Sequence, residues 1–183
     1  MTNEMMKVIE QQEQAIDYVE EAQEENGSQF LSFVVGDEEF SVSILKVQEI
    51  RAWENPTSLP NSPGYIKGVL NLRGTIVPVM DLRMRFRFKH FEYDATTVII
   101  LLKNNYNGKD CLMGCVVDGV SDVFSISESA IREVPDYGSA IDSRFTSGIM
   151  TVNNHAVTLL NLENLLNLDL IKHPYAGGNV SNG

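Results

Sequence analysis

Short apolar runs alternate with polar breaks along most of the chain, and this pattern begins at Gln29. The apolar run Phe30 to Val35 is followed by the polar stretch 36–39 and then by alternating apolar positions from Phe40 to Ile44. Two such runs around a short polar break are typical of a β-hairpin. A further strand, or a short turn that leads into one, is expected at 47–53. The pattern therefore predicts a β-rich body.

A second hairpin is predicted at 68–79, where two apolar runs flank Arg73-Gly74. Glycine supplies the positive φ that a tight connection requires, so Arg73 is expected at or beside the turn with its side chain displayed. Asp81 follows the second run and is expected to cap a short helical turn that begins at Leu82, because an aspartate oxygen accepts from the first free backbone N–H groups.

The second half of the chain repeats this texture. Strands are expected at 96–102, 112–117, 120–126, 145–150 and 156–160, followed by a short helix at 162–168 that Asn161 caps. Many short strands at this spacing favour closed or nearly closed barrels, and about 140 residues suit two small barrels better than one. We expect a mainly β fold in which the two halves match in shape rather than in sequence.

Residues 1–27 differ from this body in charge and pattern. They hold one base, Lys7, and eight acids, which gives a balance of −7: Glu4, Glu10, Glu13, Asp17, Glu20, Glu21, Glu24 and Glu25. Four apolar residues are spaced as one thin helical face: Met5, Ile9, Ile16 and Val19. We predict an acidic extension at 1–27, partly helical or disordered, a folded body at 28–170, and a flexible polar tail at 171–183.

Composition excludes several classes of function. The formal net charge is −11, which disfavours nucleic acid and anionic membranes as partners. No apolar run approaches the length of a membrane-spanning helix, and residues 1–9 lack the apolar core of a signal peptide. We therefore expect a cytoplasmic protein without membrane insertion. Cys111 and Cys115 lack zinc-site spacing and are expected to be reduced and packed.

Candidate catalytic chemistry is sparse. The three histidines lie far apart in the sequence, and no nucleotide-binding, metalloprotease or hydrolase motif is present. Asp118 and Asp122 form a possible carboxylate pair, but their β-type surroundings favour an exposed face or a turn. We therefore expect no enzymatic activity, no cofactor and no metal.

One basic and aromatic segment, 83–93, runs against the overall charge. Its bases are Arg83, Arg85, Arg87 and Lys89, and its rings are Phe86, Phe88, Phe91 and Tyr93. One interpretation is the solvated face of an alternating segment. The alternative is a nucleic-acid-binding β-barrel that stacks bases on these rings, which the net negative charge disfavours.

The most specific stretch is 47–87. It contains Val47-Gln-Glu-Ile50, then Asn71-Leu-Arg-Gly74, and then Pro78-Val-Met-Asp-Leu-Arg83 with Phe86 behind it. In this combination the stretch resembles the CheW family of chemotaxis coupling proteins, and the resemblance extends over 29–168. The chain departs from the family pattern after Phe86, where Arg87-Phe88 replaces the usual Gly-Leu.

The resemblance implies a fold and a function. The fold is two packed five-stranded SH3-like β-barrel subdomains with a short C-terminal helix. The function is that of an adaptor without catalysis or cofactor. Its implied partners are the regulatory domain of the histidine kinase CheA and the cytoplasmic tip of methyl-accepting chemotaxis receptors.

The resemblance also singles out residues for partner binding. Arg73 and Glu49 occupy family motif positions, and we expect them to lie close together on the first barrel as a partner-facing pair. A receptor tip is a helical hairpin, so its site should be an apolar groove. The candidates for that groove are Val42, Ile44, Val47, Val116 and Val120, each of which would otherwise be ordinary core.

Overall fold

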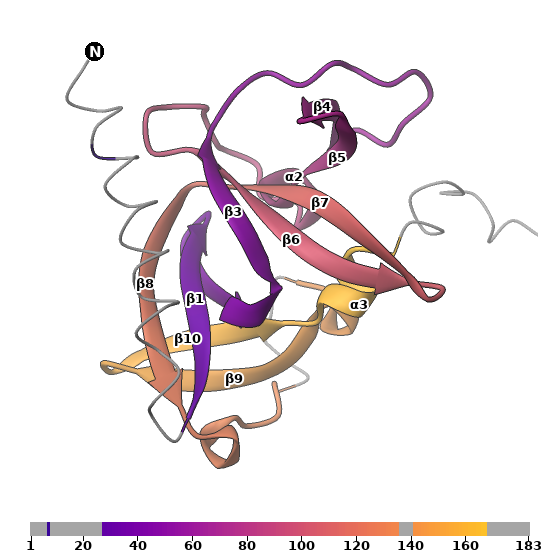
Figure 1. Cartoon of the computed structure of the whole chain (residues 1–183). Helices are drawn as coiled ribbons and strands as arrows, with labels where there is room; N and C mark the ends of the chain where they lie inside the picture. The colour runs from indigo at the N-terminus through magenta and orange to yellow at the C-terminus, as the bar shows by residue number, and fades with distance from the viewer. Residues whose placement is uncertain (1–6, 8–26, 136–140, 168–183) are drawn as a thin grey trace, which may run out of the picture.

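A computed structural model describes Lys7 and residues 27–135 and 141–167, and within these ranges the chain is mainly β (Figure 1). Its strands are β1 Ser28–Val35, β2 Glu38–Ser43, β3 Val47–Ala52, β4 Ile66–Leu72, β5 Thr75–Asp81, β6 Val98–Tyr106, β7 Lys109–Val117, β8 Gly119–Ile126, β9 Thr146–Val152 and β10 His155–Leu160. The expectations for most of the acidic extension and for the tail lie outside these residues.

Helical segments within the described residues are single turns: η2 Ile44–Lys46, α2 Leu82–Arg85, η3 Glu128–Ala130, η4 Ser143–Phe145 and α3 Leu162–Leu165. Both predicted caps are present. Asp81 accepts a hydrogen bond from the backbone N–H of Arg83, and Asn161 accepts one from that of Asn164. The C-terminal helix begins at the expected residue but ends at Leu165, before the expected end at 168.

The strands form two five-stranded sheets, which confirms the predicted fold class. One sheet has the order β8-β1-β2-β10-β9, and the other has the order β3-β6-β7-β5-β4. The second sheet is built from one continuous stretch in the middle of the chain, 47–117, and we call its subdomain the inner subdomain. The first sheet is built from the strands before and after that stretch, and we call its subdomain the outer subdomain.

The two subdomains are not the two halves of the chain, which corrects the sequence-based expectation. The N-terminal hairpin β1–β2 pairs with strands from the end of the chain: β8 runs antiparallel to β1, and β10 runs parallel to β2. Alternation along a strand indicates which face is buried, but it does not identify the neighbouring strand. The long-range pairing of β1 with β8 was therefore outside what periodicity predicts.

Strand β6 separates two buried clusters. Its residues Val98, Ile100 and Leu102 join a large cluster that extends over both subdomains, whereas Ile99 and Leu101 face a smaller cluster inside the inner subdomain. A strand buried on both faces has an unbroken apolar sequence. The run Val98-Ile-Ile-Leu-Leu102 is therefore the layer that holds the two subdomains together.

The seam of the inner subdomain closes where the chain after β3 meets β4. Thr57 and Val69 exchange backbone hydrogen bonds of 3.0 and 2.8 Å across it. Gly68 lies in this approach with a φ of 138°, and a Cβ there would lie 2.0 Å from the carbonyl oxygen of Thr57. Only glycine permits this contact, which fixes the position of the β4–β5 hairpin relative to β3.

Candidate partner-docking site

Arg73 and Glu49 form an ion pair at the rim of the inner subdomain. Arg73 Nη2 donates to Glu49 Oε2 at 2.9 Å, although 24 positions separate the two residues in the chain. The Arg73 side chain is 81% exposed and the Glu49 side chain 28% exposed. The expected proximity is therefore present, and the guanidinium keeps most of its surface available to solvent.

The backbone holds Arg73 in an unfavourable conformation. The connection between β4 and β5 consists of Arg73 with a φ of 52° and Gly74 with a φ of 86°. Positive φ at both central residues is the geometry of a type I′ turn, which favours Asn-Gly. A left-handed conformation costs an ordinary residue about 1–2 kcal/mol, so arginine at this turn carries a cost that asparagine or glycine would largely avoid.

Glu49 also connects this pair to neighbouring charges. Arg51 Nη1 donates to Glu49 Oε1 at 3.2 Å, and Arg51 Nη2 donates to Glu54 Oε1 at 3.0 Å. The chain of alternating charges therefore runs from the β4–β5 turn along the edge of β3. Each carboxylate oxygen of Glu49 has its own guanidinium partner, which orients the side chain toward Arg73.

The five apolar residues expected to form a groove do not form one. Val42 and Val116 are 0% exposed and Ile44 is 7% exposed, so all three are core side chains. Val42 and Ile44 belong to the large cluster and Val116 to the smaller one. Val47 and Val120 are half-buried against the large cluster. The burial of Val42, Ile44 and Val116 corrects the expectation, because a docked helix would have to open the core to reach them.

A different apolar groove lies on the inner subdomain. It has a volume of about 940 Å³ and runs over η2, β5 and the β6–β7 hairpin, with Leu45, Ile76, Pro78 and Leu112 in its lining. Gln48 also lines it, next to Glu49 in the sequence. We call this the η2–β5 groove. One local feature of the sequence was compatible with this groove, since Ile76 is an apolar residue that closely follows the polar turn at Arg73-Gly74. Alternation in the hairpin does not show which face of the strand is exposed, so the sequence alone did not identify Ile76 as a surface residue.

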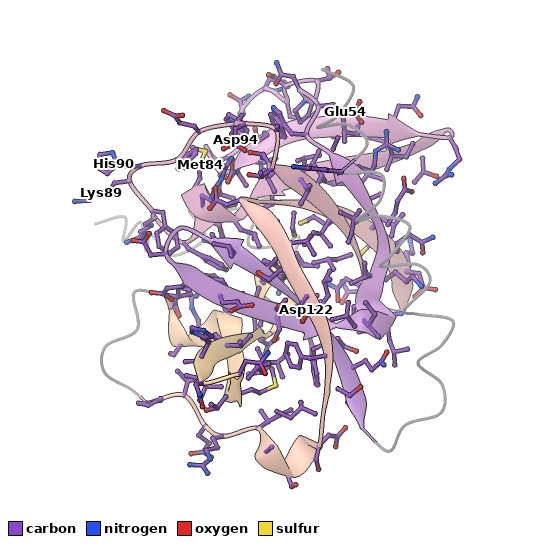
Figure 2. The ribbon with its side chains drawn as sticks, turned by 90° about the vertical axis from the view of Figure 1, so that its left-hand side faces the viewer. Glu54, Met84, Lys89, His90, Asp94 and Asp122 are labelled. Carbon is purple, nitrogen blue, oxygen red and sulfur yellow. The ribbon has the colours of Figure 1, made fainter. Side chains whose placement is uncertain are left out.

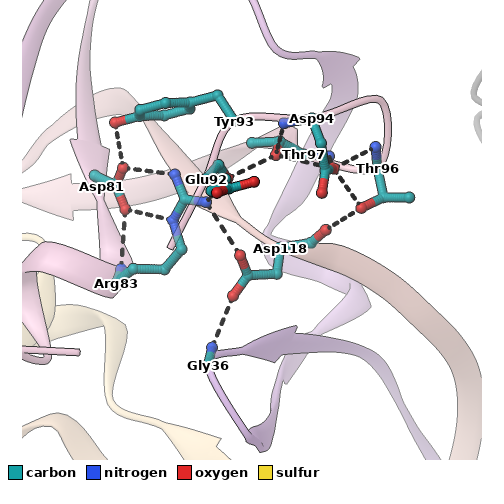
Figure 3. Close-up of polar contacts among 9 residues, drawn as sticks. All are labelled: Gly36, Asp81, Arg83, Glu92, Tyr93, Asp94, Thr96, Thr97 and Asp118. Carbon is teal, nitrogen blue, oxygen red and sulfur yellow. Dashed lines mark hydrogen bonds and ion pairs between the residues drawn. The ribbon is translucent and has the colours of Figure 1, made fainter. Parts of the chain in front are cut away.

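The second family motif, Asp81-Leu82-Arg83, is buried rather than displayed. The Asp81 and Arg83 side chains are both 0% exposed, and Arg83 donates from Nε to Asp81 Oδ1 at 3.0 Å and from Nη2 to Asp81 Oδ2 at 2.8 Å (Figure 3). Arg83 Nη1 donates to Asp118 Oδ1 at 3.0 Å and to the carbonyl oxygen of Glu92 at 2.7 Å. The interpretation of Arg83 as part of a solvated face is therefore wrong.

Aromatic rings enclose this guanidinium. The Arg83 carbon Cζ lies 4.5 Å from the ring centre of Phe91 and 4.6 Å from that of Tyr93. The Tyr93 hydroxyl donates to Asp81 Oδ2 at 2.7 Å. Burial, reinforced by the bond to Asp81 and the charge of Asp81, raises the pKa of Tyr93 to about 12. These rings therefore pack on a buried cation instead of forming a surface on which bases stack.

Burial alone would lower the pKa of the Arg83 guanidinium, but its hydrogen bonds to Asp81 and Asp118 and their charges outweigh burial, so the pKa is raised. Arg83 is therefore a permanent cation with two carboxylate partners. This is the arrangement in which a buried charge is tolerated. The remaining rings of the segment are also packed: Phe86 is 4% exposed, which removes it as a stacking platform for the nucleic-acid alternative.

The same network joins the two subdomains. Asp118 lies between β7 of the inner subdomain and β8 of the outer one, and its Oδ2 accepts from the backbone N–H of Gly36 at 2.7 Å. Gly36 is in the β1–β2 turn of the outer subdomain. Asp118 and Asp122 were expected on an exposed face or in a turn. Asp122 is exposed on β8 (Figure 2). Asp118 lies in the bend between β7 and β8, but its carboxylate faces Arg83 and Gly36.

The rest of the basic segment has mixed surroundings. The Arg85 Cζ lies between the rings of Tyr65 and Phe145, at 4.5 and 4.4 Å from their centres. Lys89 and His90 are exposed on the loop after α2 (Figure 2). A solvated face therefore describes only part of the segment.

No helix in the described part of the chain has the length and apolar character needed to cross a bilayer. Within the same residues, no group of three or more histidine, cysteine, aspartate or glutamate side chains is placed to hold a metal ion.

Comparison with known proteins places this geometry in a family. A family model described as a CheW-like domain matches residues 29–169. The chain is 41% identical to the chemotaxis protein CheW of Klebsiella aerogenes over 140 residues, which cover 76% of this chain and 82% of that one. It is 31% identical to the chemotaxis protein CheW of Helicobacter pylori over 169 residues, or 92% of this chain and 99% of that one.

A solved structure agrees with these relatives. The crystal structure of the scaffolding protein TtCheW from Thermoanaerobacter tengcongensis superimposes with a TM-score of 0.68 at 28% identity, covering 76% of this chain and 88% of that one. The range matched by the family model, 29–169, contains both family motifs. By fold, by motif and by sequence identity, this chain belongs to the CheW family of chemotaxis proteins.

Proposed function

We propose that this protein is a chemotaxis scaffold that couples methyl-accepting chemoreceptors to a CheA-type histidine kinase by direct binding and without catalysis. The rim formed by Arg73 and Glu49 is the proposed contact with the kinase regulatory domain, and Val47 and Val120 remain candidates for contact with the receptor tip. We place this activity in the cytoplasm, where the kinase and the receptor tips are accessible.

The observation that carries this proposal is the conformation and exposure of Arg73. An exposed ion pair contributes at most about 1 kcal/mol to stability, which does not exceed the cost of holding arginine at positive φ. Stability therefore does not explain arginine at this turn, whereas recognition does. A guanidinium offers forked donors to a partner carboxylate, and interface arginines are frequent hot spots.

The test is to measure binding of the CheA regulatory domain, together with kinase activation in reconstituted receptor arrays, for three variants of the full chain. We expect Arg73→Ala to weaken binding by about thirtyfold, which corresponds to about 2 kcal/mol. Arg73→Glu should weaken it further, because it places like charge against a partner carboxylate. Melting curves should show all three variants folded.

The third variant, Glu49→Arg combined with Arg73→Glu, separates recognition from structure. The swap restores an ion pair within the chain but presents each charge at the wrong place for a partner, so binding should stay weak. Arg144→Ala is the matched control, since Arg144 is 61% exposed and pairs with Asp142 at 2.6 Å in the outer subdomain. Normal binding by Arg73→Ala, or rescue by the swap, would contradict the proposed contact.

A further inference from the structure

The η2–β5 groove is lined by exposed large hydrophobic side chains. Leu45 is 80% exposed and Ile76 is 59% exposed, and these are the two highest exposures of large hydrophobic side chains among the described residues. Both side chains line the groove. Clustered exposed apolar residues of this kind indicate a surface that another segment covers.

The rim of this groove is basic in an otherwise acidic protein. Lys46 and Lys103 are exposed on it, opposed by one carboxylate, Asp110. The whole chain carries a net charge of −11, so most of its surface repels acidic segments. An occupant with apolar residues on one side and carboxylates on the other therefore fits this groove better than it fits the rest of the body.

The acidic extension 1–27 has this character in its sequence. It carries eight acids and one base, and Met5, Ile9, Ile16 and Val19 recur at the spacing that would place them on one face of a helix. The extension precedes the region matched by the CheW-like domain model, 29–169.

The attachment point of the extension lies close to the groove. β1 begins at Ser28, and two residues later Phe30 pairs with Ser43, which directly precedes η2. Phe30 lines a hollow of about 580 Å³, and this hollow shares Lys46, Asn104 and Asn105 with the groove. The chain therefore leaves the body beside a continuous depression that leads to Leu45.

We propose that residues 1–27 fold back over the η2–β5 groove as an intramolecular cover, with the apolar face on Leu45 and Ile76 and the carboxylates at Lys46 and Lys103. A tethered segment has a high effective concentration at a nearby site, so weak contacts suffice to keep it bound for much of the time. The inference does not depend on which partner binds the Arg73–Glu49 rim.

The native cysteines provide a direct test. Cys111 lines the groove and is half-buried, whereas Cys115 is fully buried and burial raises its pKa to about 12. Thiol modification of the intact, folded chain therefore reports on Cys111. If the extension covers the groove about four-fifths of the time, release of the cover should raise the modification rate about fivefold, because only the open fraction reacts.

The releasing variant is Ile9→Asp combined with Ile16→Asp in the full-length chain. We expect it to accelerate modification of Cys111, and we expect 0.5 M salt to accelerate modification of the wild-type chain in the same direction. The matched control is Tyr18→Asp, because Tyr18 would lie opposite the apolar face of a helix and its substitution should leave the rate unchanged. Melting curves and the unreactive Cys115 verify that the body remains folded.

A second measurement identifies the source of the covering segment. Protection of Cys111 within one chain is independent of protein concentration, whereas protection by a second copy increases with concentration. Equal modification rates in the wild-type chain and the double variant would overturn the proposal. Protection that disappears on dilution would overturn it as well, by assigning the cover to another molecule.

Discussion

Arg73 and Arg83 belong to neighbouring motifs of one strand pair, yet the fold uses them in opposite ways. Arg73 lies on a strained turn, 81% exposed, with Glu49 as its ion-pair partner. Arg83 is 0% exposed, bonded to Asp81 and Asp118, and enclosed by two rings. The chemistry of the side chain is the same in both places. The strength of the two ion pairs differs because of solvent: water screens the Arg73–Glu49 pair, whereas the Arg83–Asp81 pair is buried away from water.

The comparison also shows what each motif contributes. The Arg83 network joins α2, the connection between β7 and β8, and the β1–β2 turn, and so ties the inner subdomain to the outer one. The Arg73 pair bridges only the β4–β5 turn and the edge of β3. We therefore expect the Asp-Leu-Arg motif to contribute to stability, and we propose that the Asn-Leu-Arg-Gly motif contributes to recognition.

The largest effect is expected for Arg83→Met. Removal of the guanidinium leaves Asp81 as a buried charge without its cation, which should lower the free energy of unfolding by about 3–5 kcal/mol. Urea denaturation measures this change. Asp81→Asn combined with Arg83→Met should be less destabilising than the sum of the single changes, because Asp81→Asn removes the charge that Arg83→Met leaves unpaired. A loss below about 1 kcal/mol in the single variant would end the contrast with Arg73.

The next effect separates two carboxylates on one short stretch. Asp118→Asn removes a charge that faces Arg83 and weakens the bond from Gly36, so we expect a loss of about 1–3 kcal/mol. Asp122→Asn is the matched control, because Asp122 is exposed and should change stability by no more than about 0.5 kcal/mol. Equal effects at the two positions would show that the network does not join the subdomains.

A smaller effect is expected for Tyr93→Phe, about 1 kcal/mol for the lost bond to Asp81. The fold raises the pKa of Tyr93 from 10.0 to about 12, so it favours the neutral phenol. The resulting stability is fully present below pH 10 and is lost as the pH rises from 10 to about 12. Denaturation across this range should show a decline that is shallower in the variant. An unchanged pH profile would place the Tyr93 hydroxyl outside the network.

The smallest change in stability is expected for Arg73→Gly. Glycine relieves about 1–2 kcal/mol of left-handed strain, but it forfeits an exposed pair worth at most about 1 kcal/mol and makes the unfolded chain more flexible. These terms nearly offset, so the melting temperature should stay within a few degrees of wild type while kinase binding falls. Arg73→Asn, which tolerates the same turn, should behave alike. Marked destabilisation by both would make Arg73 a structural residue like Arg83.

The sequence predicted the part of the candidate site that depends on local motifs and turns. The turn at Arg73-Gly74 and the motif position of Glu49 predicted an adjacent pair, and the structure places the two side chains 2.9 Å apart. The groove residues failed because apolar runs do not distinguish a surface from a core. Val42 and Val116 are core side chains, whereas Leu45 and Ile76 are the exposed ones.

The sequence by itself determined the β-rich body, the hairpins and the two capped helical turns, because turn residues and alternation act over a few neighbouring positions. Its family motifs also indicated Arg73 and Glu49 as candidate partner-binding residues. Only the tertiary structure decided that β1 and β2 join β8–β10 and that Arg83 is buried with Asp81 and Asp118. The physical reason is that burial and charge pairing depend on contacts between residues far apart in the chain, and those contacts exist only once the two sheets have closed on each other.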